Sequence, residues 1–209
     1  MKTFKQLFAK GTIIHYKKRD IIFSPTQLPE GVYQVQKGFL YSYTMSNQGK
    51  RKIQNIVKPG EIFPLLINLT KTSSRFYVEA MTDIKLSLLE KEEFFSQIYA
   101  DSNLTQAFIQ SLANYLNVYV ERVENLEMDS IQKRVVGRLL QFASRFGIQK
   151  DNKTIFVQVP MTREIIGQSI NISRENVSRE LNKLQDKNLI AFQGKHLIIL
   201  NKEELSRLL

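Results

Sequence analysis

The first part of the chain alternates between short apolar runs and turn-forming residues. Residues 12–90 contain runs rich in β-branched and aromatic side chains, such as GTIIHY, GVYQVQKGFLYSYTM, KRKIQNIV and SRFYVEAM. In YQVQKGFLYSYTM the apolar positions alternate with polar ones, as in a strand that buries one face. The separators are typical turn formers: Ser24-Pro25, Asn47-Gln48-Gly49 and Lys58-Pro59-Gly60. This pattern predicts an antiparallel β-barrel or β-roll.

The hydrophobic period changes after residue 90, where EKEEFFSQIYA begins a helical pattern. Apolar residues then follow one another at steps of three and four: Ile109, Leu112, Leu116, Tyr119, Val123 and Leu126. This spacing is typical of the seam of a two-stranded coiled coil. It also fits a single amphipathic helix that packs on its own domain. Because polar residues flank a narrow stripe, we favour a homodimer that pairs through these six side chains.

The next segment predicts two capped helices with a strand between them. Ser130 is expected to cap the helix IQKRVVGRLLQFASRFG, which ends at Gly147. The segment KDNKT is a turn and IFVQV a strand. Thr162 is then placed to cap the helix REIIGQSI.

The last segment predicts a sharp turn, a further helix and a hairpin. Asn171 interrupts the helical run, and asparagine tolerates the left-handed conformation that a tight turn needs. Ser173 is expected to cap the following helix. The runs LIAFQ and HLIIL flank Gly194-Lys195 and form two short strands. A helix, a three-residue turn, a second helix and a hairpin make a winged helix-turn-helix.

The second of these helices separates its apolar and polar residues. At 100° per residue, Val177, Leu181 and Leu184 fall on one face, which is expected to be buried. The opposite face carries the polar side chains Arg174, Glu175, Ser178, Arg179 and Asn182. In a DNA major groove, arginine donates two hydrogen bonds to guanine, and glutamate accepts one from the amino group of cytosine. Ser173, the free amides of that helix and Arg163 are then placed for phosphates.

The charge balance supports an anionic partner. The chain has 30 Lys+Arg against 20 Asp+Glu, with a pI near 9.7, and residues 131–209 alone hold 14 basic and 7 acidic side chains. Nucleic acid is the first candidate and an acidic membrane the second. Charged residues on an exposed helix are commonly only solvated, but the basic balance, the turn and the wing favour binding to double-stranded DNA. The longest apolar run is shorter than a membrane span of ~18 residues, so a soluble, cytoplasmic protein without a membrane partner is expected.

Residues 161–190, MTREIIGQSINISRENVSRELNKLQDKNLI, resemble the helix-turn-helix of the Crp/Fnr family of bacterial transcription regulators. The run SRENVSR has Arg174, Glu175 and Arg179 where the family reads the bases of a TGTGA-type half-site. The resemblance therefore implies a palindromic site bound by a dimer. Upstream, residues 31–63 are similar to the family's β-roll, with Gly31, Gly38, Gly49 and Gly60 at its turn positions. Residues 104–128 are similar to its dimerization helix.

The family's cyclic-nucleotide pocket is where this sequence departs from the pattern. The slot of the glutamate that holds the ribose falls at Leu65, which cannot accept a hydrogen bond. Arg75 is placed to keep the phosphate-binding arginine, with Ser74 just before it. Tyr119 and Val120 stand where the family has the threonine and serine that contact adenine. These five positions are the candidate effector pocket, and cyclic AMP is not the expected ligand.

Cofactor chemistry and catalysis find little support in the sequence. The absence of cysteine removes disulfides, thiolate zinc sites and cysteine-ligated iron-sulfur clusters. Iron-sulfur clusters of this kind are bound by other sensors of the family that the sequence resembles. A haem would need His15 or His196 as an axial ligand, and both are expected to be ordinary surface or wing histidines. We expect no cofactor, no metal and no enzyme activity, because no catalytic constellation is present.

These predictions combine into an α+β protein with three parts. Residues 1–98 form an N-terminal antiparallel β-roll of the cyclic-nucleotide-binding-like type, residues 99–129 the long dimerization helix and hinge, and residues 130–209 the winged helix-turn-helix. The expected function is a homodimeric, sequence-specific DNA-binding regulator whose roll senses an unidentified small molecule or has lost sensing. The alternative is an effector-binding module that acts mainly through protein contacts, such as RNA polymerase, and binds DNA weakly. Tight, salt-sensitive and sequence-dependent DNA binding separates the two.

Overall fold

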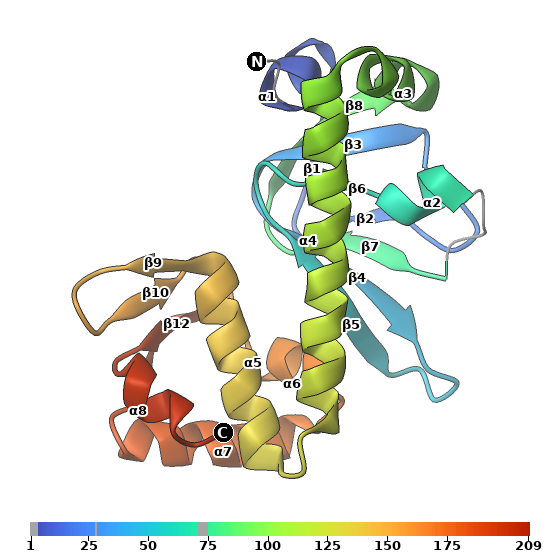
Figure 1. The fold of residues 1–209 in the computed structure, drawn as a ribbon. Coiled ribbons are helices and arrows are strands. Elements are labelled where there is room, and N and C mark those ends of the chain that lie inside the picture. Colours follow the sequence, from blue (N-terminus) through green and yellow to red (C-terminus); the bar gives the residue numbers. More distant parts are fainter. Residues whose placement is uncertain (1–3, 28, 71–74) are drawn as a thin grey trace. The chain divides into compact units, whose positions relative to one another are not determined.

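The computed structural model describes residues 4–27, 29–70 and 75–209 (Figure 1). The chain forms two compact units, one of residues 1–44 and 53–118 and the other of residues 45–52 and 119–209. The predicted α+β class is confirmed, and so is the order of β-roll, long helix and winged helix-turn-helix. No described helix is long and apolar enough to cross a membrane.

Two four-stranded sheets build the β-roll. The first has the order β1 (Thr12–Tyr16), β8 (Ile84–Glu90), β3 (Gly31–Lys37) and β6 (Ile62–Phe63). The second has the order β2 (Ile21–Phe23), β7 (Tyr77–Ala80), β4 (Leu40–Met45) and β5 (Arg51–Val57). Neighbouring strands run antiparallel wherever their register is described, as the alternating pattern predicts.

Three of the four predicted turn glycines adopt the left-handed backbone that turns require. Gly38, Gly49 and Gly60 have φ values of 85°, 73° and 88°. Gly31 differs, because it is the first residue of strand β3 and not part of a turn. A Cβ atom there would lie 2.1 Å from the carbonyl oxygen of Leu89 on the neighbouring strand, so glycine permits a close strand approach.

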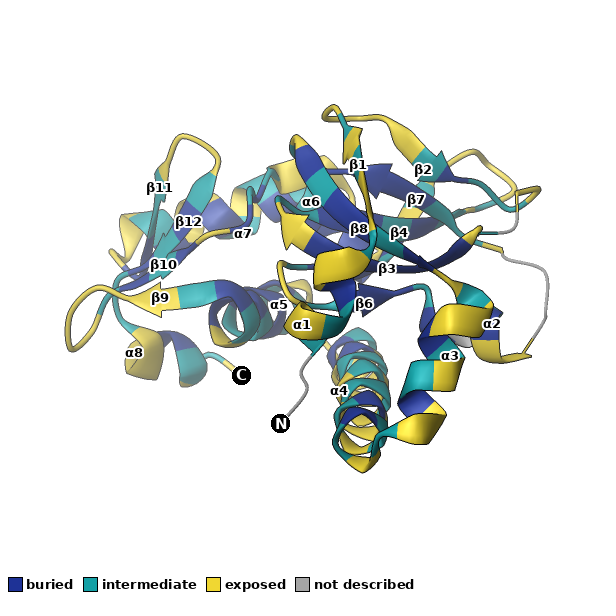
Figure 2. Ribbon diagram, turned by 90° about the horizontal axis from the view of Figure 1, so that it is seen from above, coloured by how far each residue is buried: buried dark blue, intermediate teal, exposed yellow. Residues whose placement is uncertain are grey.

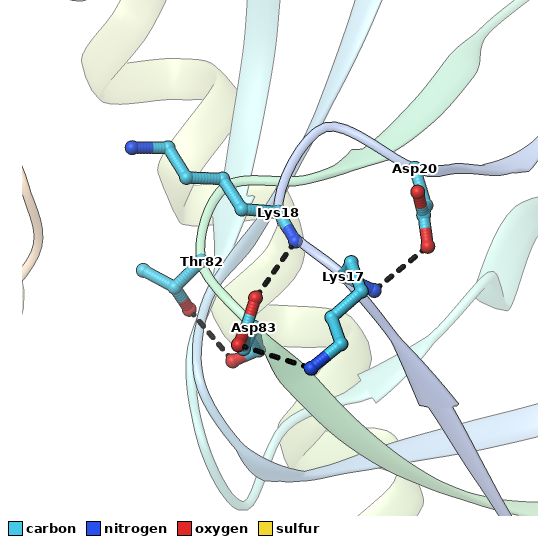
Figure 3. A network of polar contacts seen from close by, with 5 residues as sticks. All are labelled: Lys17, Lys18, Asp20, Thr82 and Asp83. Atoms are coloured by element: carbon cyan, nitrogen blue, oxygen red, sulfur yellow. Dashed lines mark hydrogen bonds and ion pairs between the residues drawn. The ribbon is translucent and has the colours of Figure 1, made fainter.

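The loop between β1 and β2 is tied to the loop between β7 and β8 (Figure 3). The backbone N–H of Lys18 donates to Asp83 Oδ1 at 3.0 Å, and Lys17 Nζ lies 3.7 Å from Asp83 Oδ2. Asp20 accepts from the backbone N–H of Lys17 at 2.7 Å. The bond from Lys18 is the main cause that lowers the pKa of Asp83. These polar contacts fix two exposed loops that the sequence alone does not pair.

Helices of the first unit pack around an apolar core. They are α1 (Phe4–Leu7), the short 3₁₀ helix η1 (Phe8–Lys10), α2 (Leu65–Thr70), α3 (Lys91–Ala100) and the beginning of α4 (Ser102–Glu127). Asp101 Oδ1 accepts from the backbone N–H groups of Asn103 and Leu104 and thereby caps α4. The core side chains are apolar: Phe8, Val32, Ile62, Leu65, Leu89, Phe94, Ile98, Leu104 and Phe108. Helix α2 was not predicted from the sequence.

The second unit contains a winged helix-turn-helix. Helix α5 (Ile131–Phe146) begins at Ser130, whose side chain accepts from the backbone N–H of Lys133, and ends at Gly147, as predicted. Helices α6 (Arg163–Ile170) and α7 (Arg174–Asp186) follow. The sheet has the order β11 (Ile190–Gln193), β12 (His196–Ile199), β10 (Ile155–Val157) and β9 (Gly147–Gln149). Strand β9 and the last helix, α8 (Lys202–Ser206), were not predicted from the sequence.

Candidate nucleic-acid interface

Two capped helices meet at a tight turn that places α7 on the surface. Thr162 Oγ1 accepts from the backbone N–H of Ile165 at 3.1 Å and begins α6. Asn171 ends that helix in the left-handed conformation, with φ 57° and ψ 40°. Ser173 Oγ accepts from the backbone N–H of Asn176 at 3.3 Å and begins α7. All three predicted roles are confirmed, and each is local hydrogen-bond chemistry at a helix end.

A glycine lets the turn close tightly against α6. A Cβ atom on Gly167 would lie 2.5 Å from the carbonyl oxygen of Ile172, which is closer than real Cβ atoms approach. The backbone N–H of Ile172 donates to Gly167 O at 3.0 Å in the same turn. The position of α7 relative to α6 therefore depends on a glycine that the sequence pattern did not single out.

Helix α7 is buried on one face and free on the other (Figure 2). Val177, Leu181 and Leu184 are buried, as the helical wheel predicts. Arg174, Glu175, Arg179 and Asn182 are exposed, and Ser178 is half-buried. Among the described residues, the side chains of Arg174 and Glu175 form no hydrogen bond and no ion pair. They are therefore available to an external ligand.

The third predicted base-reading residue has a neighbour that orients it. Arg179 Nη2 donates to Asn176 Oδ1, three residues earlier on α7. Residues at this spacing lie on the same side of a helix. The contact restricts the guanidinium of Arg179 before any ligand binds, which lowers the entropic cost of a specific contact. Asn176 was not singled out from the sequence.

The wing supports the residue predicted to contact phosphate at the start of α6. Arg163 is exposed, and its guanidinium lies over the ring of Phe192 in β11, 5.8 Å from the ring centre. The backbone N–H of Met161 donates to Lys195 O at 2.6 Å, which joins the wing turn to the residues before α6. Arg163, Ser173 and the free N–H groups at the start of α7 lie on two consecutive helix starts, where anions are favoured.

The two histidines have ordinary surroundings. The ring of His196 stacks on Phe156 at 5.2 Å, and its Nδ1 lies 3.2 Å from Val157 O, so contacts within the wing sheet account for this residue. His15 is exposed on β1. Among the described residues, no group of three or more His, Asp or Glu side chains is arranged to hold a metal ion.

The positions predicted for an effector pocket lie in different surroundings. Leu65 is buried in the apolar core beside α3 and α4. Arg75 is exposed, and Ser74 lies outside the described residues. On α4, Tyr119 is half-buried and Val120 is 47% exposed.

Three aromatic rings stack in the core of the roll. Tyr33 stacks on Phe63 with the ring centres 5.4 Å apart, and Phe23 stacks on the same ring at 6.4 Å. Burial, with a smaller effect of the Glu30 charge, raises the pKa of Tyr33 to about 12. The raised pKa follows from the burial of this side chain.

Helix α4 carries two apolar stripes. One stripe packs on the core of the first unit through Leu104 and Phe108, with Leu112 and Tyr115 partly buried beside them. The other is exposed: Ile109 is 60%, Leu116 63% and Val123 52% accessible. Leu112 thus contacts its own unit, whereas three of the six predicted seam residues present most of their surface outward. An apolar stripe of this kind is typical of an association surface.

Comparisons with known proteins agree with this arrangement. A model of the Crp-like helix-turn-helix domain matches residues 133–208, and a model of the cyclic nucleotide-binding domain matches residues 13–101. The cAMP-activated global transcriptional regulator CRP of Salmonella typhimurium is 27% identical over 194 residues, which cover 91% of this chain and 86% of that protein. The nitrogen fixation regulation protein FixK of Azorhizobium caulinodans is 26% identical over 199 residues, 95% of this chain and 79% of that protein. The structure of FixK2 from Bradyrhizobium japonicum superimposes with a TM-score of 0.82 at 25% identity and covers 95% of this chain and 96% of its own.

Proposed function

Because the chain belongs to the Crp/Fnr family of DNA-binding transcription regulators, we propose that it acts as a homodimer that reads a palindromic DNA site with two copies of α7. The observation that carries this proposal is the polar face of that helix. Arg174 and Glu175 are exposed, and their side chains form no hydrogen bond and no ion pair with described residues, while Val177, Leu181 and Leu184 are buried on the other face of the helix. On the same exposed face, Arg179 donates a hydrogen bond to Asn176, which orients its guanidinium.

The site read by each α7 is a TGTGA-like half-site. Arg174 and Arg179 each donate to the O6 and N7 atoms of a guanine, and Glu175 accepts from the amino group of a cytosine. Ser178 and Asn182 lie on the same face and make further contacts. Arg163 and Ser173 bind phosphates, which fix the register of the helix without reading sequence.

Dimerization supplies the second half-site. Residues 99–129 act as the dimerization helix and hinge, and the exposed stripe of Ile109, Leu116 and Val123 pairs with the same stripe of a second chain. A two-fold axis along this seam presents the two α7 helices to half-sites about one DNA turn apart. A dimer of this kind prefers DNA sites that are inverted repeats.

Cyclic AMP is not the ligand in this proposal. The relative from Salmonella typhimurium is named as cAMP-activated, but here an apolar Leu65 occupies the position expected for the ribose-binding carboxylate. That side chain is buried in an apolar core, and the rings of Tyr33, Phe63 and Phe23 stack in the core of the roll. We infer that the protein binds DNA without cyclic AMP and responds to another molecule or to its own abundance.

The proposal is tested by selecting sites from random duplex DNA with the purified full-length protein at ~150 mM salt, where phosphate contacts alone give weak binding. One arm contains cyclic AMP and one does not. Enrichment of the same TGTGA-like palindrome in both arms is expected. Enrichment only with cyclic AMP contradicts the ligand assignment, and no enrichment in either arm contradicts unliganded, sequence-specific binding.

A further inference from the structure

Two arginine side chains of the second unit are buried without a carboxylate partner. Arg122, near the end of α4, is 9% exposed, and Arg138, in α5, is 6% exposed. Neither forms an ion pair with any described residue. Burial is the main cause that lowers the pKa of both groups, and repulsion from Arg122 is the second cause for Arg138, whose pKa falls to about 9. Two like charges in one buried region destabilise a fold unless a counter-charge joins them.

A short chain of hydrogen bonds places these arginines on facing helices. Arg138 Nη1 donates to Gln141 Oε1 at 3.1 Å, and Gln141 Nε2 donates to the backbone oxygen of Glu121 at 2.8 Å. Glu121 directly precedes Arg122, so the link joins α5 to the turn of α4 that carries Arg122. The Glu121 carboxylate favours the charged form of Arg138 only weakly, since its effect ranks last, and this side chain is exposed.

The same turn of α4 holds a donor and an acceptor with no partner. Arg122 Nε is buried and forms no hydrogen bond, and Asn125 Oδ1 is buried and accepts none. The amide nitrogen of Asn125 is engaged, because it donates to Arg134 O at 3.0 Å. Unpaired buried polar atoms are costly. A water molecule that bridged the two atoms would satisfy both, but it would leave the two positive charges without compensation.

We propose that the junction of α4 and α5 binds a small oxyanion that also carries an O–H group, of the class of hydrogen phosphate or a phosphate monoester. Arg122 and Arg138 provide the positive charge. Arg122 Nε donates to an anionic oxygen, and Asn125 Oδ1 accepts from the O–H group. Guanidinium groups suit this role because their planar array of N–H donors matches the oxygens of a phosphate.

One of the two arginines is hydrogen-bonded to the first helix of the helix-turn-helix. Arg138 Nε donates to Ser169 Oγ at 3.1 Å, and Ser169 donates to Ile166 O within α6. An anion that fixes the guanidinium of Arg138 therefore also fixes a contact of the first helix of the helix-turn-helix. An effect on DNA affinity rests on the proposed function, whereas binding of the anion does not.

The test is a calorimetric titration of the full-length protein with inorganic phosphate, without DNA, against chloride at equal ionic strength. In a second arm, glycerol phosphate replaces phosphate and tests whether the site prefers a monoester to the free ion. In a third arm, sulfate, which lacks the O–H group, replaces phosphate. Arg122→Met removes the unpartnered side chain, and Lys133→Met removes the same charge from a half-buried position on α5. Phosphate or its ester is expected to bind wild type and Lys133→Met with the same affinity. Sulfate is expected to bind both proteins more weakly than phosphate does.

Arg122→Met is expected to bind phosphate about tenfold more weakly or worse. Without phosphate this variant should unfold at the same temperature as wild type or a higher one, because it removes an uncompensated buried charge. Absence of phosphate binding to wild type, or equal binding to the variant, overturns the site. A variant that loses only dimerization in sedimentation, with no anion effect, assigns the counter-charge to a carboxylate of the partner subunit and also overturns it. DNA affinity that ignores bound phosphate overturns only the coupling.

Discussion

Leu116 gives the sharpest test of the dimer, because a change there separates association from folding. The side chain is 63% exposed in the single chain, so Leu116→Asp removes little of the contact area on which the chain's own fold depends. In a paired seam, most of this exposed surface becomes buried against the second chain. Fully burying a leucine side chain contributes about 1.5–3 kcal/mol. Two copies at this exposure then contribute about 2–4 kcal/mol to the dimer.

The variant loses that contribution and adds two carboxylates that face each other across the seam. The lost burial alone weakens association roughly 30- to 1,000-fold, and juxtaposed like charges weaken it further. Asn117→Asp is the matched control, since it introduces the same charge at the next exposed position of α4, outside the seam. Sedimentation equilibrium should find monomers for Leu116→Asp and dimers for Asn117→Asp.

Helix content supplies the second readout. The circular dichroism spectrum of the monomeric variant should show the same helix content as that of wild type. A variant that remains dimeric with unchanged affinity refutes the seam. Loss of helix content refutes it in another way, because Leu116 would then belong to the core of its own unit.

Three further predictions concern helices α6 and α7 and the β-roll. Arg174→Ala should weaken binding to the selected site by about 1–3 kcal/mol and relax the preference at one base pair per half-site, whereas Arg163→Ala should weaken all sequences alike; titrations on single-base variants of the site distinguish the two, and a uniform loss for Arg174→Ala would contradict base reading. Ser173→Ala removes the side chain that accepts from Asn176 N and should destabilise the helix-turn-helix by about 1 kcal/mol in urea unfolding, while an unchanged midpoint would mean that the cap contributes nothing. Burial raises the pKa of Tyr33 from 10.0 to about 12, so its contribution to stability is complete below pH 10 and is lost as pH rises toward 12; Tyr33→Phe should remove this alkaline loss, and identical pH profiles would contradict it.

Local signals carried most of the sequence-based prediction of the DNA-binding unit. The side chains of Ser130, Thr162 and Ser173 each accept a hydrogen bond from an N–H group three residues further along the chain. Asn171 ends α6 through its own left-handed backbone conformation. The periodicity of α7 likewise depends on a single helix. Such features are encoded by neighbouring residues, so the sequence is sufficient to predict them.

Features that depend on distant parts of the chain were missed or misplaced. Gly31 was assigned to a turn, but its role comes from the approach of the Leu89 carbonyl in a strand far along the chain. The support of Arg163 by Phe192 links α6 to the wing. The burial of Arg122 and Arg138 depends on how separate helices pack and not on their neighbours in the sequence. Short elements such as β9, with three residues, carry too little periodicity to be recognised.

The central claim is that α7 reads sequence, and a comparison of affinities tests it most directly. The full-length protein is titrated at ~150 mM salt with a duplex that carries the selected palindrome and with a duplex of the same composition in scrambled order. We predict a ratio of roughly a thousandfold or more in favour of the palindrome. A ratio near one, with the same steep salt dependence for both duplexes, would mean that the basic surface binds phosphates alone and would contradict the account.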